Sequence, residues 1–171
     1  YGAAEGLPDE AIQSIAVQGD VVWLATLSGL AKLEIGSGRI NRIPSIVFTI
    51  GELAVGDSGV WLLSDAGAYR LPPGSLEWQK LPEFPGTASL ASAVRTGFWW
   101  FMWGNKEIVL IEAMLANRDG LYVLQNRQLW RYVPAEGKWH SIVKDAWQLL
   151  EQRGTVWAMC TEAVARYDPS S

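Results

Sequence analysis

Few side chains in this sequence could do covalent or metal chemistry. Cys160 is the only cysteine and His140 is the only histidine. A nucleophilic thiol or hydroxyl needs a neighbouring base, whereas His140 stands beside Trp139 in a segment expected to form a solvated outer strand. A histidine-based metal site fails on count, and no disulfide can form within the chain. We therefore expect no catalytic residue, and we interpret Cys160 as a buried, inert thiol.

Four acidic residues could suggest calcium loops. Asp20, Asp57, Asp65 and Asp119 each stand in a turn just before a predicted strand. None is arranged with the alternating oxygen ligands of a calcium loop. Aspartate also tolerates the left-handed backbone of tight turns and hydrogen-bonds to it locally. We interpret these residues as turn formers and expect neither a metal nor a cofactor.

A further group of polar residues could bind a ligand without reacting with it. These residues fall in loops predicted to join the second and third strands of a repeated unit. They mix donors, acceptors and one aromatic stacking surface, Trp103, which suits a polar ligand. The predicted site consists of Ser28, Asp65, Trp103, Asn105, Lys106, Asn126, Arg127 and Glu162.

An internal repeat must position these loops. In four places an aromatic residue is followed nine positions later by a basic one, in the pairs Trp23/Lys32, Trp61/Arg70, Tyr122/Arg131 and Trp157/Arg166. Each pair lies among short apolar runs separated by Gly-rich or Asp-rich turns, which is typical of antiparallel hairpin strands. Four strands per copy predict a β-propeller blade. We interpret the bases as structural, exposed to solvent or stacked on a neighbouring aromatic.

One copy of the repeat is irregular. Trp99 follows Trp61 at the interval that separates Trp61 from Trp23, but Ile108 stands nine positions later in place of a base. About fifteen residues, roughly one strand and a loop, are missing before Tyr122. Either this blade has lost its outer strand, or a segment near 112–113 is absent. We predict one all-β propeller domain of about five blades, with repeats at about 6–44, 48–82, 88–112, 112–143 and 146–171.

The ends of the chain raise the question of how the ring closes. The last copy stops after its third strand, and residues 1–4 could supply a short outer strand that completes it. Five compact blades closing on themselves is the first expectation. The alternatives are a piece of a larger propeller, or a part-ring that self-associates with a second chain through its open strand edges.

Charge and composition argue against several classes of function. The chain has 14 basic and 18 acidic residues, interspersed, for a net charge of −4. Nucleic acids and anionic membranes require a concentrated basic face, so neither is expected as a main partner. No segment approaches the roughly 18 apolar residues that span a bilayer. The ten tryptophans are expected mainly to pack between twisted sheets, since each can bury about 150–250 Å².

The first copy resembles the two-component regulator propeller repeat. Gly-Leu-Pro opens the segment 6–16, which is followed by the turn Gly19-Asp20, the aromatic strand 21–26 and then Gly29-Leu30 before Lys32. The other copies keep the aromatic residue but lose Gly-Leu-Pro. The resemblance implies a β-propeller without catalytic residues. It also implies an extracytoplasmic location, periplasmic or secreted, because such repeats commonly form the sensing parts of bacterial signalling proteins.

The expected function is non-enzymatic recognition of a small polar molecule, a glycan or a protein through loops on one face. A glycan-binding, lectin-like propeller is one alternative. A propeller lyase or hydrolase is another, and it would need acids and bases converging on one face. A weaker likeness to the streptogramin lyase propellers is poorly supported by a single histidine. A purely structural assembly domain would instead form a defined oligomer.

Overall fold

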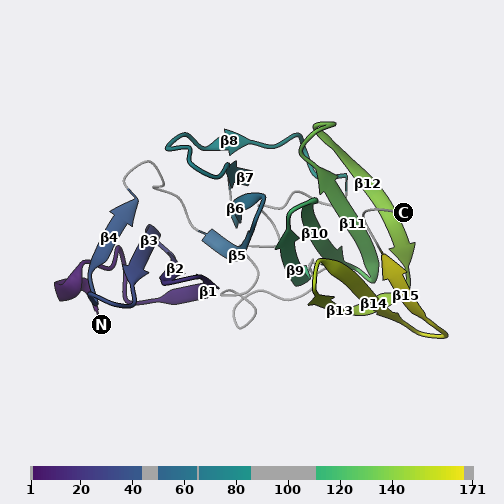
Figure 1. The fold of residues 1–171 in the computed structure, drawn as a ribbon, viewed down its shortest axis with the longest axis horizontal. Helices are drawn as coiled ribbons and strands as arrows, with labels where there is room; N and C mark the ends of the chain where they lie inside the picture. The colour runs from purple at the N-terminus through teal and green to yellow at the C-terminus, as the bar shows by residue number, and fades with distance from the viewer. Residues whose placement is uncertain (1, 44–49, 65, 86–110, 168–171) are drawn as a thin grey trace, which may run out of the picture.

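The computed structural model describes residues 2–43, 50–64, 66–85 and 111–167, and these residues are mostly β-strand (Figure 1). Within these ranges, fifteen strands form four antiparallel sheets, each built from consecutive strands. This hairpin-by-hairpin order is that of propeller blades, as the sequence predicts. No helix within the described ranges is long and apolar enough to cross a membrane.

We name the sheets A to D in chain order. Sheet A contains β1 (Ile12–Gln18), β2 (Val21–Thr26), β3 (Gly29–Glu34) and β4 (Ile40–Ile43). Sheet B contains β5 (Ile50–Gly56), β6 (Gly59–Ser64), β7 (Gly67–Leu71) and β8 (Gln79–Lys80). Sheet C contains β9 (Ile111–Asn117), β10 (Gly120–Gln125), β11 (Gln128–Val133) and β12 (Lys138–Lys144). Sheet D has three strands, β13 (Ala146–Gln152), β14 (Thr155–Cys160) and β15 (Val164–Tyr167).

The nine-residue spacing of aromatic and base corresponds to a cross-strand pair. In every sheet the aromatic residue of the second strand lies directly opposite the base of the third strand. In sheet B, the Cζ atom of Arg70 lies 5.0 Å from the centroid of the Trp61 ring. The Arg70 guanidinium also donates to the main-chain oxygen of Ser58, from Nε at 3.0 Å and Nη2 at 2.7 Å. The base therefore stacks on its aromatic partner and closes the preceding turn, which is a structural role.

The four sheets pack face against face in chain order, so that each sheet has two distinct faces. We call the face with the repeat aromatic the front face and the opposite face the rear face. Trp23 and Ala25 of sheet A pack on Leu53 and Leu62 of sheet B. Trp61 and Leu63 of sheet B pack on Leu121 and Val123 of sheet C. Tyr122 and Leu124 of sheet C pack on Val156 and Ala158 of sheet D. Every contact thus joins the front face of one sheet to the rear face of the next.

Sheets B and C are in direct contact although a long segment separates them in the sequence. The predicted irregular repeat at 88–112 lies almost wholly in this segment, outside the described residues. At the end of the inner strands, a Cβ atom added to Gly56 would lie 2.4 Å from the main-chain oxygen of Ala116. Because the two backbones approach so closely, sheet C directly follows sheet B in the row of sheets.

The N-terminus differs from the expected outer strand at residues 1–4. Ala3–Glu5 form a short 3-10 helix, η1, which ends at Gly6 in a left-handed conformation with φ 110°. The chain then buries Leu7 against the rear face of sheet A, where it contacts Leu24. Arg42 Nε donates to the Gly6 main-chain oxygen at 3.1 Å and so ties this segment to β4. The apolar contact of Leu7 therefore anchors the N-terminus to sheet A instead of extending sheet D.

Tyr122 predicts how stability depends on alkaline pH. The residue is fully buried between sheets C and D, and this burial raises the pKa of its phenol to about 12, partly offset by the nearby Arg131 guanidinium. The unfolded chain loses this proton near pH 10, so the free energy of unfolding should fall by up to about 2 kcal/mol between pH 10 and pH 12. Below pH 10 this contribution is fully present.

Tyr122→Phe removes the titrating group and should flatten this alkaline decline. The measurement is urea unfolding of both proteins between pH 8 and about pH 11.5, within the window set by the two pKa values. At neutral pH the variant should be close to wild type, because the Tyr122 hydroxyl makes no hydrogen bond of good geometry with the described residues. Parallel declines in the two proteins would contradict the assignment.

Candidate ligand-binding site

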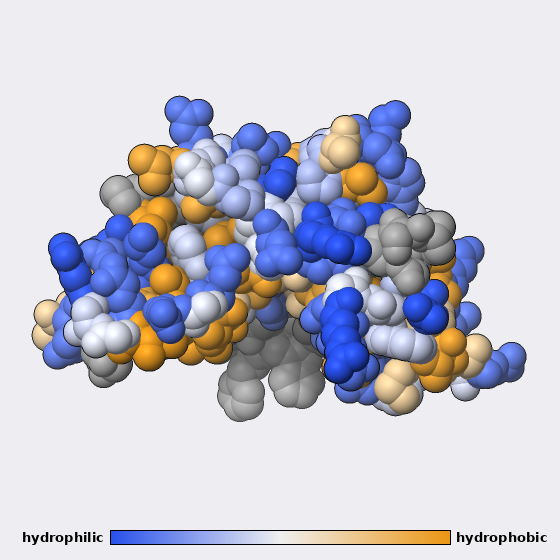
Figure 2. All heavy atoms as spheres, in the orientation of Figure 1, coloured by the Kyte–Doolittle hydropathy of each residue, from blue (hydrophilic) through white to orange (hydrophobic). Residues whose placement is uncertain are grey.

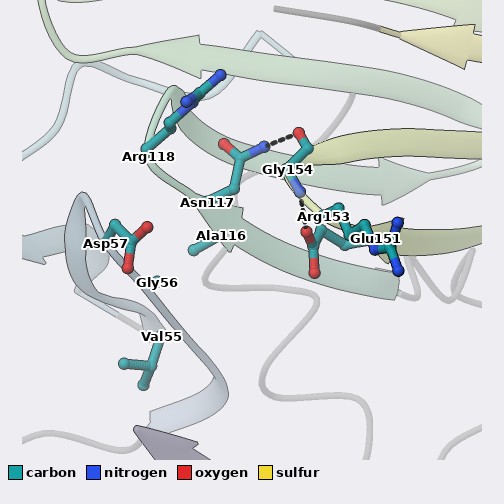
Figure 3. A pocket seen from close by; sticks show the side chains of 9 residues that line it. All are labelled: Val55, Gly56, Asp57, Ala116, Asn117, Arg118, Glu151, Arg153 and Gly154. Atoms are coloured by element: carbon teal, nitrogen blue, oxygen red, sulfur yellow. Dashed lines mark hydrogen bonds between the residues drawn. The ribbon is translucent and has the colours of Figure 1, made fainter.

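The turns after the first strands of sheets B, C and D converge on one pocket, which we call the turn pocket (Figure 3). Its volume is about 450 Å³. It is lined by Val55, Gly56, Asp57, Ala116, Asn117, Arg118, Glu151, Arg153 and Gly154. The three turns occupy equivalent positions in successive sheets, so the pocket lies at the end of the inner strands β5, β9 and β13.

Two buried polar side chains hold the walls of the turn pocket together. The Ser58 hydroxyl accepts a hydrogen bond from Trp61 Nε1 at 3.2 Å and donates one to the main-chain oxygen of Asn117. The Asn117 side chain donates from Nδ2 to the Gly154 main-chain oxygen at 3.2 Å and accepts from the Asp119 amide at 2.9 Å. A chain of hydrogen bonds therefore runs from the core aromatic of sheet B across sheet C to the turn of sheet D.

Charged side chains of both signs border the turn pocket. Asp57 comes from sheet B, Arg118 from sheet C, and Glu151 and Arg153 from sheet D (Figure 3). Glu151 Oε1 accepts a hydrogen bond from the Gly154 amide at 2.5 Å and so orders its own turn. The Arg118 side chain is 63% exposed, with Nε 3.5 Å from an Asp119 carboxylate oxygen. The pocket offers guanidinium donors and carboxylate acceptors at its rim, which suits a ligand with polar groups of both kinds.

Two of the predicted site residues come together in a different pocket. Arg127 and Glu162 both line a space of about 500 Å³ between sheets C and D, which we call the loop pocket. It lies where the second strands meet the third strands, at the opposite end of the sheets from the turn pocket. The other lining residues are Lys144, Asp145, Cys160, Thr161 and Ala163. Asn126 precedes Arg127 in the same left-handed turn, with φ values of 49° and 60°.

The remaining predicted residues do not join the loop pocket among the described residues. Ser28 lies in sheet A, two sheets away from sheet C, and its hydroxyl donates to Asp9 Oδ2 at 2.8 Å. Four of the predicted site residues lie outside the described part of the chain, namely Asp65, Trp103, Asn105 and Lys106. The structure therefore places Arg127, Asn126 and Glu162 close to one pocket and Ser28 elsewhere.

Arg127 is held in the loop pocket by several partners. Its amide donates to Glu112 Oε1 at 3.2 Å, its guanidinium donates to the Thr161 hydroxyl, and its Nε lies 3.9 Å from Asp145 Oδ1. Its main-chain oxygen accepts from the Ala146 amide at 2.9 Å. These contacts join the start of sheet D to the loops of sheet C. Arg127 thus has a structural role, although its guanidinium also faces the pocket.

The groups considered for catalysis lie apart. Cys160, expected to be buried, is instead half-buried and lines the loop pocket in sheet D. His140 lies on the outer strand β12 of sheet C, where Nε2 is 2.8 Å from Glu136 Oε2 in an exposed pair. In the part of the chain that the structure describes, no three His, Cys, Asp or Glu side chains come together as a metal site.

The turn pocket was missed because its residues resemble ordinary turn residues. The interpretation of Asp57 as a turn former is confirmed by its place between β5 and β6. A positional signal was nevertheless present, because Asp57, Arg118 and Arg153 each stand four residues before the repeat aromatic. Because this position is equivalent in the three copies, its charged side chains are expected at the same end of the propeller.

Comparisons with known proteins show the fold. No protein-family model matches this sequence, and no curated protein matches it. One similar structure is the extracellular domain of a candidate hybrid two-component system, BT4673, from B. thetaiotaomicron, with a TM-score of 0.56 and 17% identity over 94% of this chain and 21% of that chain. A second is the corresponding domain of BT3049, with a TM-score of 0.56 and 15% identity over 99% of this chain and 25% of that chain.

A third similar structure is that of a computationally designed protein, Ika4. Its TM-score is 0.55 at 12% identity, over 92% of this chain and 90% of that chain. At such identities the likeness concerns the fold alone, which is an all-β, propeller-type arrangement of antiparallel blades. The present chain spans only about a fifth to a quarter of the two-component-system chains.

Proposed function

We propose that this chain is a non-catalytic binding module whose turn pocket recognises a small polar molecule. The observation that supports this most is the convergence of three equivalent turns, from sheets B, C and D, on one space of about 450 Å³. Ligand pockets commonly measure about 300–1,000 Å³, so a molecule of the size of an amino acid or a sugar fits this space.

The charges at the rim narrow the chemistry of the proposed ligand. Arg118 and Arg153 can bind an anionic group, because guanidinium pairs well with carboxylate in a bidentate geometry. Asp57 on the opposite wall can accept from an ammonium or a hydroxyl group. We therefore propose a ligand that combines an acidic group with a donor, such as an amino acid or an acidic sugar. A neutral glycan is the alternative.

We also propose that the module is the sensing part of an extracytoplasmic bacterial signalling protein. Two observations support this proposal. The fold is shared with the extracellular domains of the candidate two-component systems BT4673 and BT3049. The first repeat also carries the Gly-Leu-Pro pattern of the two-component regulator propeller repeat at residues 6–8.

The proposed site predicts which arginines matter for binding. A thermal-shift screen of amino acids, dicarboxylates, acidic sugars and neutral sugars would identify a ligand, and calorimetry would then measure its affinity. The double variant Arg118→Ala with Arg153→Ala should weaken binding by about tenfold or more, since a hydrogen bond to a charged group contributes about 1.5–3 kcal/mol. Arg127→Ala is the matched control, because Arg127 lines the loop pocket and not the turn pocket. Since Arg127 also joins sheets C and D, circular dichroism should verify that this variant is folded before its affinity is measured.

Because the two pockets have different lining residues, the affinities of these variants show which pocket binds the ligand. Unchanged affinity in the double variant together with lost binding in Arg127→Ala would overturn the turn pocket and favour the loop pocket predicted from the sequence. Binding of neutral sugars alone would overturn the acidic ligand class. If no compound in the screen raises the melting temperature, the proposal of a small polar ligand is contradicted.

A further inference from the structure

The row of four sheets ends in two faces that no described sheet covers. Sheet A is first in the row, and no described sheet covers its rear face, although Leu7 of the N-terminal segment packs on Leu24 and Ala31 there. Sheet D is last in the row, and no described sheet covers its front face. In Figure 1 the sheets fan outward from the inner strands β1, β5, β9 and β13, with sheets A and D at the two ends of the fan. Figure 2 shows apolar surface over sheet A and again over sheet D, in the lower part of the view.

The rear face of sheet A is exposed and apolar along its inner strand β1, beside the part that Leu7 covers. Ile15 pairs with Leu24 on this face and is 60% exposed, and Val17 pairs with Val22 and is 61% exposed. The equivalent of Ile15 in sheet B is Leu53, which is only 5% exposed because the front face of sheet A covers it. The same strand position is thus buried where a neighbouring sheet is present and open where none is.

The open front face of sheet D is also apolar. Leu150, Met159 and Val164 lie on this face and are 61%, 38% and 62% exposed. The equivalents of Met159 are Leu63 in sheet B and Leu124 in sheet C, two residues after the repeat aromatic, and both are 0% exposed. Sheet D therefore presents to solvent the surface that sheets B and C bury against their next neighbours.

The two open faces match each other in kind. All three contacts within the chain join a front face to a rear face, and the two faces left over are one front face and one rear face. Sheet D of one chain can therefore pack on sheet A of another chain by the same type of contact. Exposed apolar patches of this kind commonly mark surfaces for protein association.

We propose that two copies of this chain associate head to tail, with sheet D of each copy packed on sheet A of the other. Both open faces are then buried, and the two joints are identical by symmetry. Head-to-tail contacts close a ring when the rotation per copy permits it. The described residues of two copies supply eight sheets, three-stranded sheet D included, and propellers typically have about 4–8 blades. The joint is face to face, in place of the edge-to-edge association expected from the sequence.

Single charges placed on the two faces test this proposal. Light scattering after size-exclusion chromatography should give wild type twice the 18.9 kDa mass of one chain. Ile15→Glu on sheet A and Leu150→Glu on sheet D should each reduce the mass to one chain. Leu76→Glu is the matched control, because Leu76 is 93% exposed but lies between β7 and β8, away from both faces. Circular dichroism would verify that each variant remains folded.

A mixing experiment distinguishes head-to-tail contact from pairing of like faces. In an equimolar mixture of Ile15→Glu and Leu150→Glu, one joint has both wild-type faces, so the mixture should recover a two-chain species that neither variant forms alone. If only one of the two variants dissociates, like faces pair and the proposal is wrong. A monomeric wild type over a wide concentration range also overturns it, and favours coverage of these faces by another part of a longer polypeptide. Neither result bears on ligand binding at the turn pocket.

Discussion

Replacing Trp61 by alanine is expected to lower the free energy of unfolding by about 3–5 kcal/mol, the usual cost of deleting a large aromatic side chain from a core. Trp61 is 0% exposed and packs between sheets B and C. Its ring meets that of Tyr132 edge to face at a centroid distance of 5.8 Å. Alanine would leave a cavity at this contact, because the surrounding strands can only partly collapse into the space.

The loss extends beyond the cavity because the Trp61 ring also organises polar groups. Burial lowers the pKa of the Arg70 guanidinium that stacks on the ring, so this cation depends on its aromatic partner and on the Ser58 carbonyl for compensation. Trp61 Nε1 additionally donates to the Ser58 hydroxyl. Without the ring, both Arg70 and Ser58 lose a partner, and we expect the cost to lie toward the upper end of the range.

Chemical denaturation at one fixed protein concentration measures this effect. Trp147→Ala is the matched control, because Trp147 is 51% exposed and the same substitution there removes far less buried surface. Its cost should stay below about 1 kcal/mol, as is usual for partly exposed positions. If the two variants lose equal stability, Trp61 does not have the central packing role described here.

The strands could be predicted from the sequence because each depends on short-range pattern. The predicted aromatic strand 21–26 coincides with β2, whose last four residues are buried on both faces of the sheet. The nine-residue register is also local, since a tight turn places Trp61 directly opposite Arg70. The interpretation of the base as structural is supported in sheet B, where Arg70 stacks on the ring and binds the turn carbonyl.

The candidate site could not be predicted because it depends on contacts between sheets. The turn pocket combines residues near 57, 118 and 153, which no local pattern brings together. The aspartate and glycine of a turn that lines a pocket are the same residue types that any tight turn requires. At the N-terminus, burial of Leu7 on sheet A outweighed the expected strand at residues 1–4. Tertiary packing determines both the turn pocket and the conformation of the N-terminus, and the repeat pattern alone does not predict this packing.

Gly56→Ala is expected to destabilise the protein by about 2–3 kcal/mol, as overpacking of a close contact does. The added Cβ would lie 2.4 Å from the main-chain oxygen of Ala116 and 2.9 Å from the amide nitrogen of Asn117. Both are backbone atoms that cannot move aside as the end of a flexible side chain can. The only relief is to separate β5 from β9, which breaks the contact between the Ser58 hydroxyl and sheet C.

Gly36→Ala is the matched control for this substitution, since a Cβ at Gly36 would meet nothing within 4 Å and its φ is not in the left-handed region. That change should be neutral or slightly stabilising, because alanine restricts the unfolded chain. Gly56 also lines the turn pocket, so separation of the two strands should weaken ligand binding together with stability. If Gly56→Ala is as stable as Gly36→Ala, sheets B and C do not meet as closely as described, and the wall that they share in the turn pocket is misplaced.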